Sequence, residues 1–190
     1  METIFTLPYT EFAVASALQE AFPATEGYSL YMPVSRQQKA VDLALIRRKQ
    51  DVTRCLTLQV KASRPYHVKG KAEAQGERLT YCGWFNTFKV DPMADFYFFV
   101  CVFPVEARKA IKTSTTWEPL ILCFSRAEAD DLLTNVKMKK GKAETKFEFG
   151  YNDDSKVFLL RGATPGEPPD LSQHLLRHKV SALITRFEAP

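Results

Sequence analysis

The chain has 190 residues, of which 45% are hydrophobic, so it can bury a full core and is not a disordered polypeptide. The net charge of +4 is compatible with a polyanionic partner but does not select one. No apolar run approaches the roughly 20 residues of a membrane span, and the first residues lack the basic start and apolar core of a signal peptide. We therefore expect no membrane contact and a cytoplasmic location. Four widely spaced cysteines without a C-x-x-C pair are expected to be buried free thiols: Cys55, Cys82, Cys101 and Cys123.

The first half of the chain predicts a helix, a strand and a hairpin. Residues 9–22 have a helical period, with Ala15, Leu18 and Phe22 on one stripe. A short strand is expected at 28–33. Two β-rich runs at 40–46 and 55–62 are joined by a short polar connection, which favours an antiparallel hairpin. The region 64–95 has no clear period, and we expect it to include loop.

The second half predicts buried strands, two helices and a further strand pair. The apolar runs 96–103 and 119–124 are typical of strands covered on both faces. Ser125 and Glu128 have the spacing of a capping box, so a helix should begin there. Strands at 146–151 and 156–160 precede a final amphipathic helix over 171–187. This order predicts an α/β (α+β) fold around a mixed sheet, with one domain over 1–162 and, at 163–190, a linker and a helix that packs on it.

Glu11 is the first polar residue in an unexpected position. It shares a helical stripe with Ala15, Leu18 and Phe22 and so points toward the predicted core. A carboxylate on that side costs free energy unless water, a cation or a partner meets it. The alternative interpretation is that Glu11 lies at the rim of the helix and reaches solvent.

Three further polar residues fall together in the predicted hairpin. If Ala44 pairs with Thr57, strand alternation sets Asp42 opposite Gln59, with Lys61 just beyond on the same face. Carboxylate and amide oxygens suit a hard divalent cation, and a partly desolvated lysine can orient or deprotonate water or neutralise charge on phosphorus. The alternative is a solvated sheet face without a catalytic role.

The segments "TEFAVASAL", "VDLALI" and "LTLQVKAS" together resemble the PD-(D/E)xK nuclease superfamily, and more closely those members whose third motif reads Q-V-K. The resemblance implies a restriction endonuclease-like fold, with a central mixed β-sheet flanked by helices. It matches Glu11 to the helix acid, Asp42 to the metal-binding aspartate, Gln59 to the second acidic position and Lys61 to the lysine.

The same resemblance implies Mg²⁺ or Mn²⁺ held by Glu11, Asp42 and Gln59, and hydrolysis of phosphodiester bonds in nucleic acid, with DNA as the expected substrate. Because Gln59 replaces a carboxylate, the site has one negative charge fewer and should bind the cation more weakly. A catalytically degenerate fold that binds nucleic acid or a protein without cleavage is the alternative. Many nucleases of this kind act as dimers, so a homodimer is allowed.

Basic and aromatic residues after the motif are candidate contacts to nucleic acid, by charge or by stacking on unpaired bases: Arg64, Tyr66, Lys69, Lys71 and Trp84. Each aromatic is also compatible with core packing. His174 and His178 have the i, i+4 spacing of a metal pair, but the glutamate of H-E-x-x-H is missing. A polar helix face is therefore favoured over a zinc site. A basic run is expected to form a solvated turn: Lys137, Lys139, Lys140 and Lys142.

Overall fold

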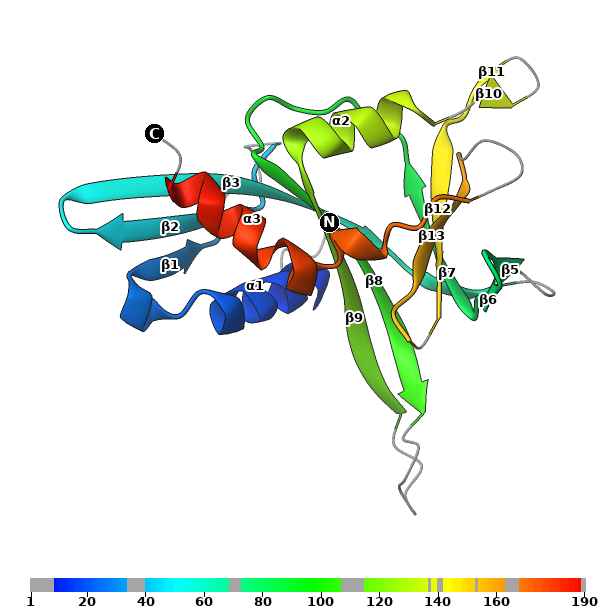
Figure 1. Cartoon of the computed structure of the whole chain (residues 1–190), viewed down its shortest axis with the longest axis horizontal. Helices are drawn as coiled ribbons and strands as arrows, with labels where there is room; N and C mark the ends of the chain where they lie inside the picture. Colours follow the sequence, from blue (N-terminus) through cyan, green and yellow to red (C-terminus); the bar gives the residue numbers. More distant parts are fainter. Residues whose placement is uncertain are drawn as a thin grey trace, which may run out of the picture.

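The protein is described by a computed structural model that covers residues 9–33, 40–68, 73–106, 115–136, 138–139, 142–152, 154–162 and 168–188. In this part of the chain the fold is a mixed α and β structure with a five-stranded main sheet, a four-stranded small sheet and three α-helices (Figure 1). The α+β class predicted from the sequence is therefore confirmed. None of the helices in the described part is long and apolar enough to cross a membrane.

The main sheet has the strand order β1-β2-β3-β8-β9. Its strands are β1 (Tyr28–Tyr31), β2 (Leu43–Lys49), β3 (Val52–Ser63), β8 (Phe96–Glu106) and β9 (Thr115–Ser125). Only the β3 and β8 pair is parallel, and the other neighbours are antiparallel. The β2–β3 hairpin was predicted, but its connection is shorter than expected. Lys49 pairs with Val52, and Gln50 adopts a left-handed φ of 54° in the turn.

The small sheet has the order β13-β12-β7-β4. Its strands are β4 (Pro65–His67), β7 (Tyr81–Asn86), β12 (Lys146–Tyr151) and β13 (Val157–Arg161). Two short hairpins flank it: β5 (Glu73–Ala74) with β6 (Glu77–Arg78), and β10 (Met138–Lys139) with β11 (Lys142–Ala143). The predicted strand pair at 146–151 and 156–160 is present, with the second strand at Val157–Arg161. The strands within 64–95 were not predicted, because most are short and the longest contains a glycine where an apolar residue would reveal the period.

The helices are α1 (Tyr9–Ala21), α2 (Arg126–Thr134) and α3 (Leu176–Glu188), with 3-10 turns η1 (Ala24–Glu26) and η2 (Ser172–His174). The capping box of α2 forms as predicted. The backbone N–H of Glu128 donates to Ser125 Oγ at 3.3 Å, and the backbone N–H of Ser125 donates to Glu128 Oε2 at 2.8 Å. The predicted final helix is wrong in its first turns, because Leu175 has an extended ψ of 137° that separates η2 from α3.

Two apolar clusters lie on opposite faces of the main sheet. On one face, α1 and α3 cover residues such as Leu43, Leu58 and Phe98. On the other face, the small sheet and α2 cover Tyr97 and Phe99. The small sheet approaches closely at Gly83, where a Cβ atom would lie 2.3 Å from Cys101 Sγ. Glycine is needed here because any side chain would separate the two sheets.

The free cysteines are only partly as expected. Cys82, Cys101 and Cys123 are buried, whereas Cys55 is exposed, so the prediction of a buried thiol is wrong at this position. The exposure of Cys55 follows from the tertiary structure. Cys55 lies in β3 on a stretch of the sheet that no described helix or strand covers, although the neighbouring residues Leu56 and Leu58 are buried on the opposite face.

Candidate active site

Asp42 lies directly before β2, and both its backbone and its carboxylate form hydrogen bonds with β3. The predicted pairing of Ala44 with Thr57 is present, and the ladder ends at Leu43 and Leu58. Beyond it, the backbone N–H of Asp42 donates to the Leu58 carbonyl at 2.9 Å. The backbone N–H of Val60 donates to Asp42 Oδ2 at 2.7 Å. The carboxylate therefore lies alongside Gln59 at the point where β2 begins.

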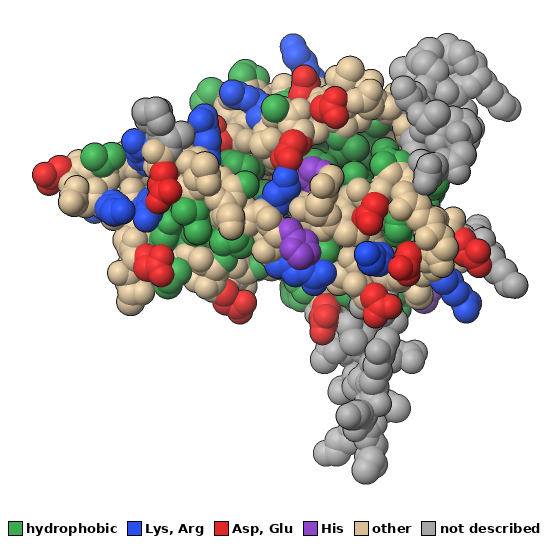
Figure 2. Space-filling view, viewed as in Figure 1, with side chains coloured by type: hydrophobic (Ala, Val, Ile, Leu, Met, Phe, Trp, Pro, Cys, Tyr) green, Lys and Arg blue, Asp and Glu red, His purple; other side chains and the backbone are tan. Residues whose placement is uncertain are grey.

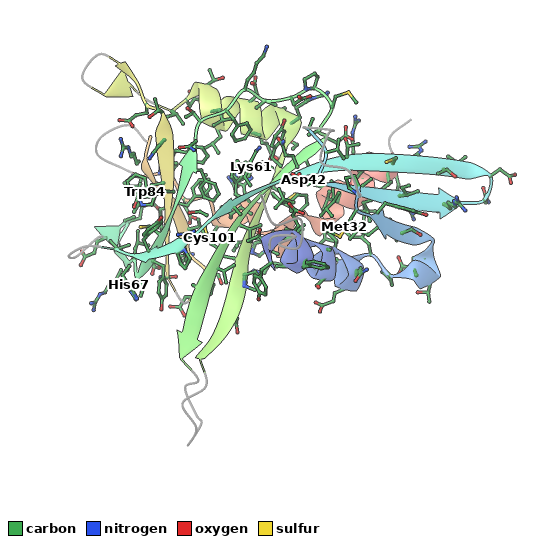
Figure 3. All side chains as sticks on the ribbon, turned by 180° about the vertical axis from the view of Figure 1, so that it is seen from behind. Met32, Asp42, Lys61, His67, Trp84 and Cys101 are labelled. Atoms are coloured by element: carbon green, nitrogen blue, oxygen red, sulfur yellow. The ribbon has the colours of Figure 1, made fainter. Side chains whose placement is uncertain are left out.

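Gln59 and Lys61 follow on the same face of β3. Gln59 is only 6% exposed, and Lys61 is half-buried. Burial lowers the pKa of the Lys61 ammonium, and the Asp42 carboxylate offsets part of this change. Figure 3 shows Asp42 and Lys61 close together near the centre of the molecule. The face is therefore not open to solvent at these two β3 residues, unlike the solvated face considered as the alternative.

Phe88 was not singled out from the sequence, although it contacts Lys61. Lys61 Nζ lies 4.8 Å from the centre of the Phe88 ring, a cation–π distance. The ring is held in turn by Tyr97, at 5.5 Å between ring centres. The aromatic content of the region 64–95 was the available signal, but it does not indicate which ring meets the lysine.

Asp95 lies directly before β8 and fixes β3 at the edge opposite β2. Its Oδ2 accepts hydrogen bonds from both the backbone N–H and the Oγ1 of Thr57, each at 3.0 Å. Thr57 Oγ1 also lies 2.5 Å from the Met93 carbonyl oxygen, so its single proton is shared between two acceptors, this carbonyl and the Asp95 carboxylate. These bonds fix β3 two residues before Gln59, so the backbone that carries Gln59 and Lys61 is anchored at this point.

Glu11 lies in the first turn of α1 and is half-buried. The predicted stripe is confirmed, since Ala15, Leu18 and Phe22 are all buried. Tyr9 and Thr10 border a hollow with the residues that end β3 and begin β4, so the start of α1 adjoins the end of β3. However, α1 packs on the face of the main sheet opposite Lys61. Glu11 and Asp42 could approach each other only around the edge of β3 beyond the start of β2. No described strand pairs with β3 along that part of its edge.

The oxygen atoms of Asp42 and Gln59 suit a hard divalent cation, which they would bind with modest affinity. A carboxylate offers about four lone-pair sites, so the bond from the Val60 N–H to Asp42 leaves others on that side chain. The side-chain carbonyl of Gln59 is a further oxygen donor. Within the described ranges, no group of three or more His, Cys, Asp or Glu side chains is placed to hold a metal. A site here would therefore depend on the Gln59 amide.

The candidate nucleic-acid contacts are divided between two places. Arg64 is exposed directly after β3. Tyr66 is 49% exposed and pairs with Cys82 in the small sheet. Trp84 lies two residues further along β7, with the Arg161 guanidinium 5.2 Å from its ring centre. Strand alternation turns Tyr66 and Trp84 away from the main sheet, so the structure does not bring them together with Lys61. Lys69 and Lys71 lie outside the described residues.

The two histidines do not form a pair on one helix. His174 is in η2, buried and stacked on Phe124 with 4.0 Å between ring centres, while His178 belongs to α3. Burial and the Lys179 charge lower the pKa of His174, which Glu128 partly offsets. The interpretation of a shared polar helix face is therefore wrong for His174. Of the basic run, Lys139 and Lys142 pair in the β10–β11 hairpin, and Lys137 and Lys140 lie outside the described residues.

Comparison with known proteins adds no relative. No family model matches the chain, and no curated protein or solved structure matches it either. The case for a function therefore rests on the arrangement of the chain's own residues, namely Asp42 at the start of β2 with Gln59 and Lys61 on the adjoining strand.

Proposed function

We propose that this protein is a metal-dependent nuclease with a restriction endonuclease-like fold, which hydrolyses phosphodiester bonds in nucleic acid, with DNA as the expected substrate. The observation that carries the proposal is the position of Lys61. Its ammonium is half-buried beside the Asp42 carboxylate, on the same sheet face as the buried Gln59. A cation beside an oxygen-rich donor set is the arrangement that hydrolysis of a phosphodiester needs.

The residues take distinct roles in this proposal. Asp42, Gln59 and Glu11 hold Mg²⁺ or Mn²⁺, which neutralises phosphate charge and makes bound water more acidic. Lys61 orients the attacking water or stabilises the negative charge that develops on phosphate oxygen. Its lowered pKa favours the release of a proton compared with an exposed lysine. Phe88 holds the ammonium in place from one side.

The decisive experiment compares cleavage by site variants and matched controls. Purified protein is incubated with linear duplex, branched and single-stranded DNA in the presence of Mg²⁺ or Mn²⁺. Asp42→Asn keeps an oxygen that can accept from the Val60 N–H but removes the charge, and Lys61→Met keeps an apolar stem of similar length. Each should lower the rate by about 100-fold or more, the usual scale for a general acid or base.

Two exposed residues provide the matched controls. Asp130 lies on α2 and Lys89 follows Phe88, and both are exposed. Asp130→Asn and Lys89→Met make the same chemical changes and should retain the wild-type rate. Cleavage that survives both Asp42→Asn and Lys61→Met would remove these residues from the mechanism.

A second candidate function is favoured by Gln59. With an amide in the second acidic position, the described residues supply no acidic triad, as expected of a nuclease fold that binds nucleic acid without cleavage. Such a protein would bind DNA with an affinity that falls steeply with salt and is unaffected by metal. Calorimetry with Mn²⁺ separates the two. If the metal site is genuine, Gln59→Glu should bind Mn²⁺ more tightly than the wild type, whereas Gln59→Leu should not bind it.

A further inference from the structure

One face of the β2–β3 hairpin carries three positive charges beside the end of α3. Arg47 lies opposite Arg54, and Lys49 lies opposite Val52. Because Arg47 and Lys49 are two residues apart on β2, strand alternation sets all three cationic side chains on one face of the sheet. This is the face that α3 covers, since Arg54 donates to the Phe187 carbonyl at 2.7 Å. Figure 2 shows lysine and arginine side chains at this end of the molecule, where α3 ends beside the hairpin in Figure 1.

The three cations line a cavity of about 360 Å³. The remaining lining residues are Gln50, Val52, Phe187 and Glu188. The volume falls at the lower end of the range for ligand-binding pockets in proteins. The lining combines positively charged groups with the apolar side chains of Val52 and Phe187. The cavity therefore has the size and composition to hold a small charged molecule.

The negative groups at this cavity do not balance its positive charge. Glu188 is the one acid among the described lining residues, and Asp51 in the adjoining turn does not line the cavity. Glu188 Oε1 lies 3.5 Å from Arg47 Nη1, and the Glu188 side chain is 58% exposed. Hydrogen bonds between two charged groups are usually about 2.7–2.9 Å long, so this contact is weak. The carbonyl end of α3 adds about half a negative charge, and roughly one and a half positive charges remain.

Two of the cations also lack hydrogen-bond acceptors among the described residues. Arg47 Nε is buried and finds none, although the guanidinium lies 5.0 Å from the centre of the Tyr28 ring. Lys49 is exposed, and no described residue forms an ion pair with it. Like charges directly opposite each other on neighbouring strands repel, and a buried donor without an acceptor costs free energy. An anion in the cavity would relieve the repulsion between Arg47 and Arg54 and offer acceptors to the cations.

We propose that this cavity is a binding site for the phosphate monoester group of a small ligand, held by Arg47, Lys49 and Arg54. A phosphate monoester carries about 1.5 to 2 negative charges at neutral pH, which matches the surplus, whereas a carboxylate or a phosphodiester carries one. Guanidinium groups present two parallel N–H donors to phosphate oxygens, and lysine adds a point charge.

The cavity is separate from the candidate active site. From Arg54 to Lys61 the strand rises about 23 Å at 3.3 Å per residue, and residues an odd number of positions apart point to opposite faces of the sheet. The proposal therefore does not rest on the proposed nuclease function, and either can fail without the other.

Isothermal titration calorimetry of the full chain tests the charge of the ligand. The probes are inorganic phosphate, glycerol phosphate and dimethyl phosphate, at about pH 8, where the first two are dianions and the third has a single charge. In a buffer of about 0.1 M ionic strength, the dianions should bind with a Kd of about 1 mM or lower, and dimethyl phosphate at least about tenfold more weakly. Equal binding of dimethyl phosphate, or no saturable binding of either dianion up to about 20 mM, would overturn the proposal.

Two adjacent exposed residues provide matched variants. Lys49→Gln removes a charge from the cavity, and Arg48→Gln removes one from the other face of β2. Lys49→Gln should weaken the binding of glycerol phosphate about fivefold, whereas Arg48→Gln should change it by less than about twofold because salt screens the more distant charge. Equal weakening by the two variants would indicate general attraction to a positive protein and would contradict a site in the cavity.

Arg47→Lys tests the guanidinium itself. The variant keeps the charge but loses the planar pair of donors, so glycerol phosphate should bind about tenfold more weakly. Wild-type affinity would remove Arg47 from the site. A thermal melt without ligand establishes that the variant is folded, and if it is not, the exposed Lys49 variant decides alone.

A variant of the candidate active site separates the two places where phosphate could bind. Lys61→Met lies outside the cavity and should bind glycerol phosphate with the wild-type Kd, even though it removes cleavage in the proposed mechanism. Loss of phosphate binding in Lys61→Met together with normal binding in Lys49→Gln would place the phosphate at Lys61 and overturn this proposal.

Discussion

The two halves of the main sheet are built differently. β8 is covered on both faces, and Phe96 to Val100 are each at most 5% exposed. In β1, β2 and the first part of β3, the described helices and strands cover only one face, and the other carries exposed Tyr31 and Cys55. The candidate active site lies at the boundary, since β3 passes from the open half into the covered half between Cys55 and Gln59. Partial coverage at this boundary lowers the pKa of Lys61 while leaving an open approach beside it.

The largest expected effect tests the difference in coverage. Phe99 is fully buried and contacts the rings of Phe85 and Phe147 from the small sheet. Phe99→Ala should lower the free energy of unfolding by about 3–5 kcal/mol, whereas Tyr31→Ala on the exposed face of β1 should cost about 1 kcal/mol or less. Urea denaturation measures both. Similar losses would show that this face of β1 is covered in solution.

The next largest effect is expected at Gln59, where β3 passes from the open half of the sheet into the covered half. Gln59 is 6% exposed, so Gln59→Glu places a carboxylate in a poorly hydrated position. Without metal, the variant should be less stable than the wild type at pH 7 by about 1–3 kcal/mol. Burial raises a carboxyl pKa, so this loss should grow as the pH rises above about 4.3, the ordinary glutamate value. Thermal melts with and without Mn²⁺ measure it. Recovery with Mn²⁺ supports a metal site, and a loss that Mn²⁺ leaves unchanged argues against one.

A smaller effect is the pH dependence of the free energy of unfolding that His174 contributes in the covered half. His174 faces the Glu128 carboxylate, the Lys179 ammonium and the Cys123 carbonyl, and its ring stacks on Phe124. Its pKa is lowered in the fold, so the unfolded chain binds more protons and stability falls as pH drops below about 6.5. The slope due to this group can reach about 1.4 kcal/mol per pH unit. His174→Leu should flatten the stability profile between pH 5 and 6.5, and an unchanged profile would contradict this assignment.

The smallest effect is expected at Lys61. Its pKa is lowered because burial disfavours the charged form, so the wild-type ammonium reduces stability at neutral pH. Lys61→Met should therefore raise the free energy of unfolding at pH 7, by no more than about 1 kcal/mol, even though it removes activity in the proposed mechanism. The gain should shrink as the pH rises toward 10.5, where the unfolded lysine also loses its proton. Calorimetric melts at pH 7 and pH 9.5 check the sign, and a destabilised variant at pH 7 would contradict it.

Local sequence signals predicted much of the frame around the site. The register of the β2–β3 hairpin follows from strand alternation, and the structure has Ala44 opposite Thr57 as expected. The start of α2 follows from the spacing of Ser125 and Glu128, whose hydrogen bonds span only three residues. The apolar run of β8 indicated burial on both faces. In each case the decisive contacts lie close in sequence or repeat with a fixed period.

Local sequence signals did not predict how the small sheet is assembled. Its strands β7 and β12 are separated by some sixty residues, and the packing of this sheet on the main sheet depends on Gly83 allowing close contact with Cys101. The same long-range packing decides which polar residues are buried. Gln59 and Cys55 occupy equivalent parities in β3, but one is covered and the other is exposed.

The sequence by itself determined which side chains share a face of β3, because alternation is a property of the strand backbone. It thereby set Asp42 beside Gln59 and Lys61. Only the tertiary structure decided how far each is shielded from water, since that depends on where the small sheet ends and on a ring such as Phe88, 27 residues away from Lys61 along the chain. Shielding lowers the Lys61 pKa, whereas Thr53 and Cys55 in the first part of the same strand are exposed.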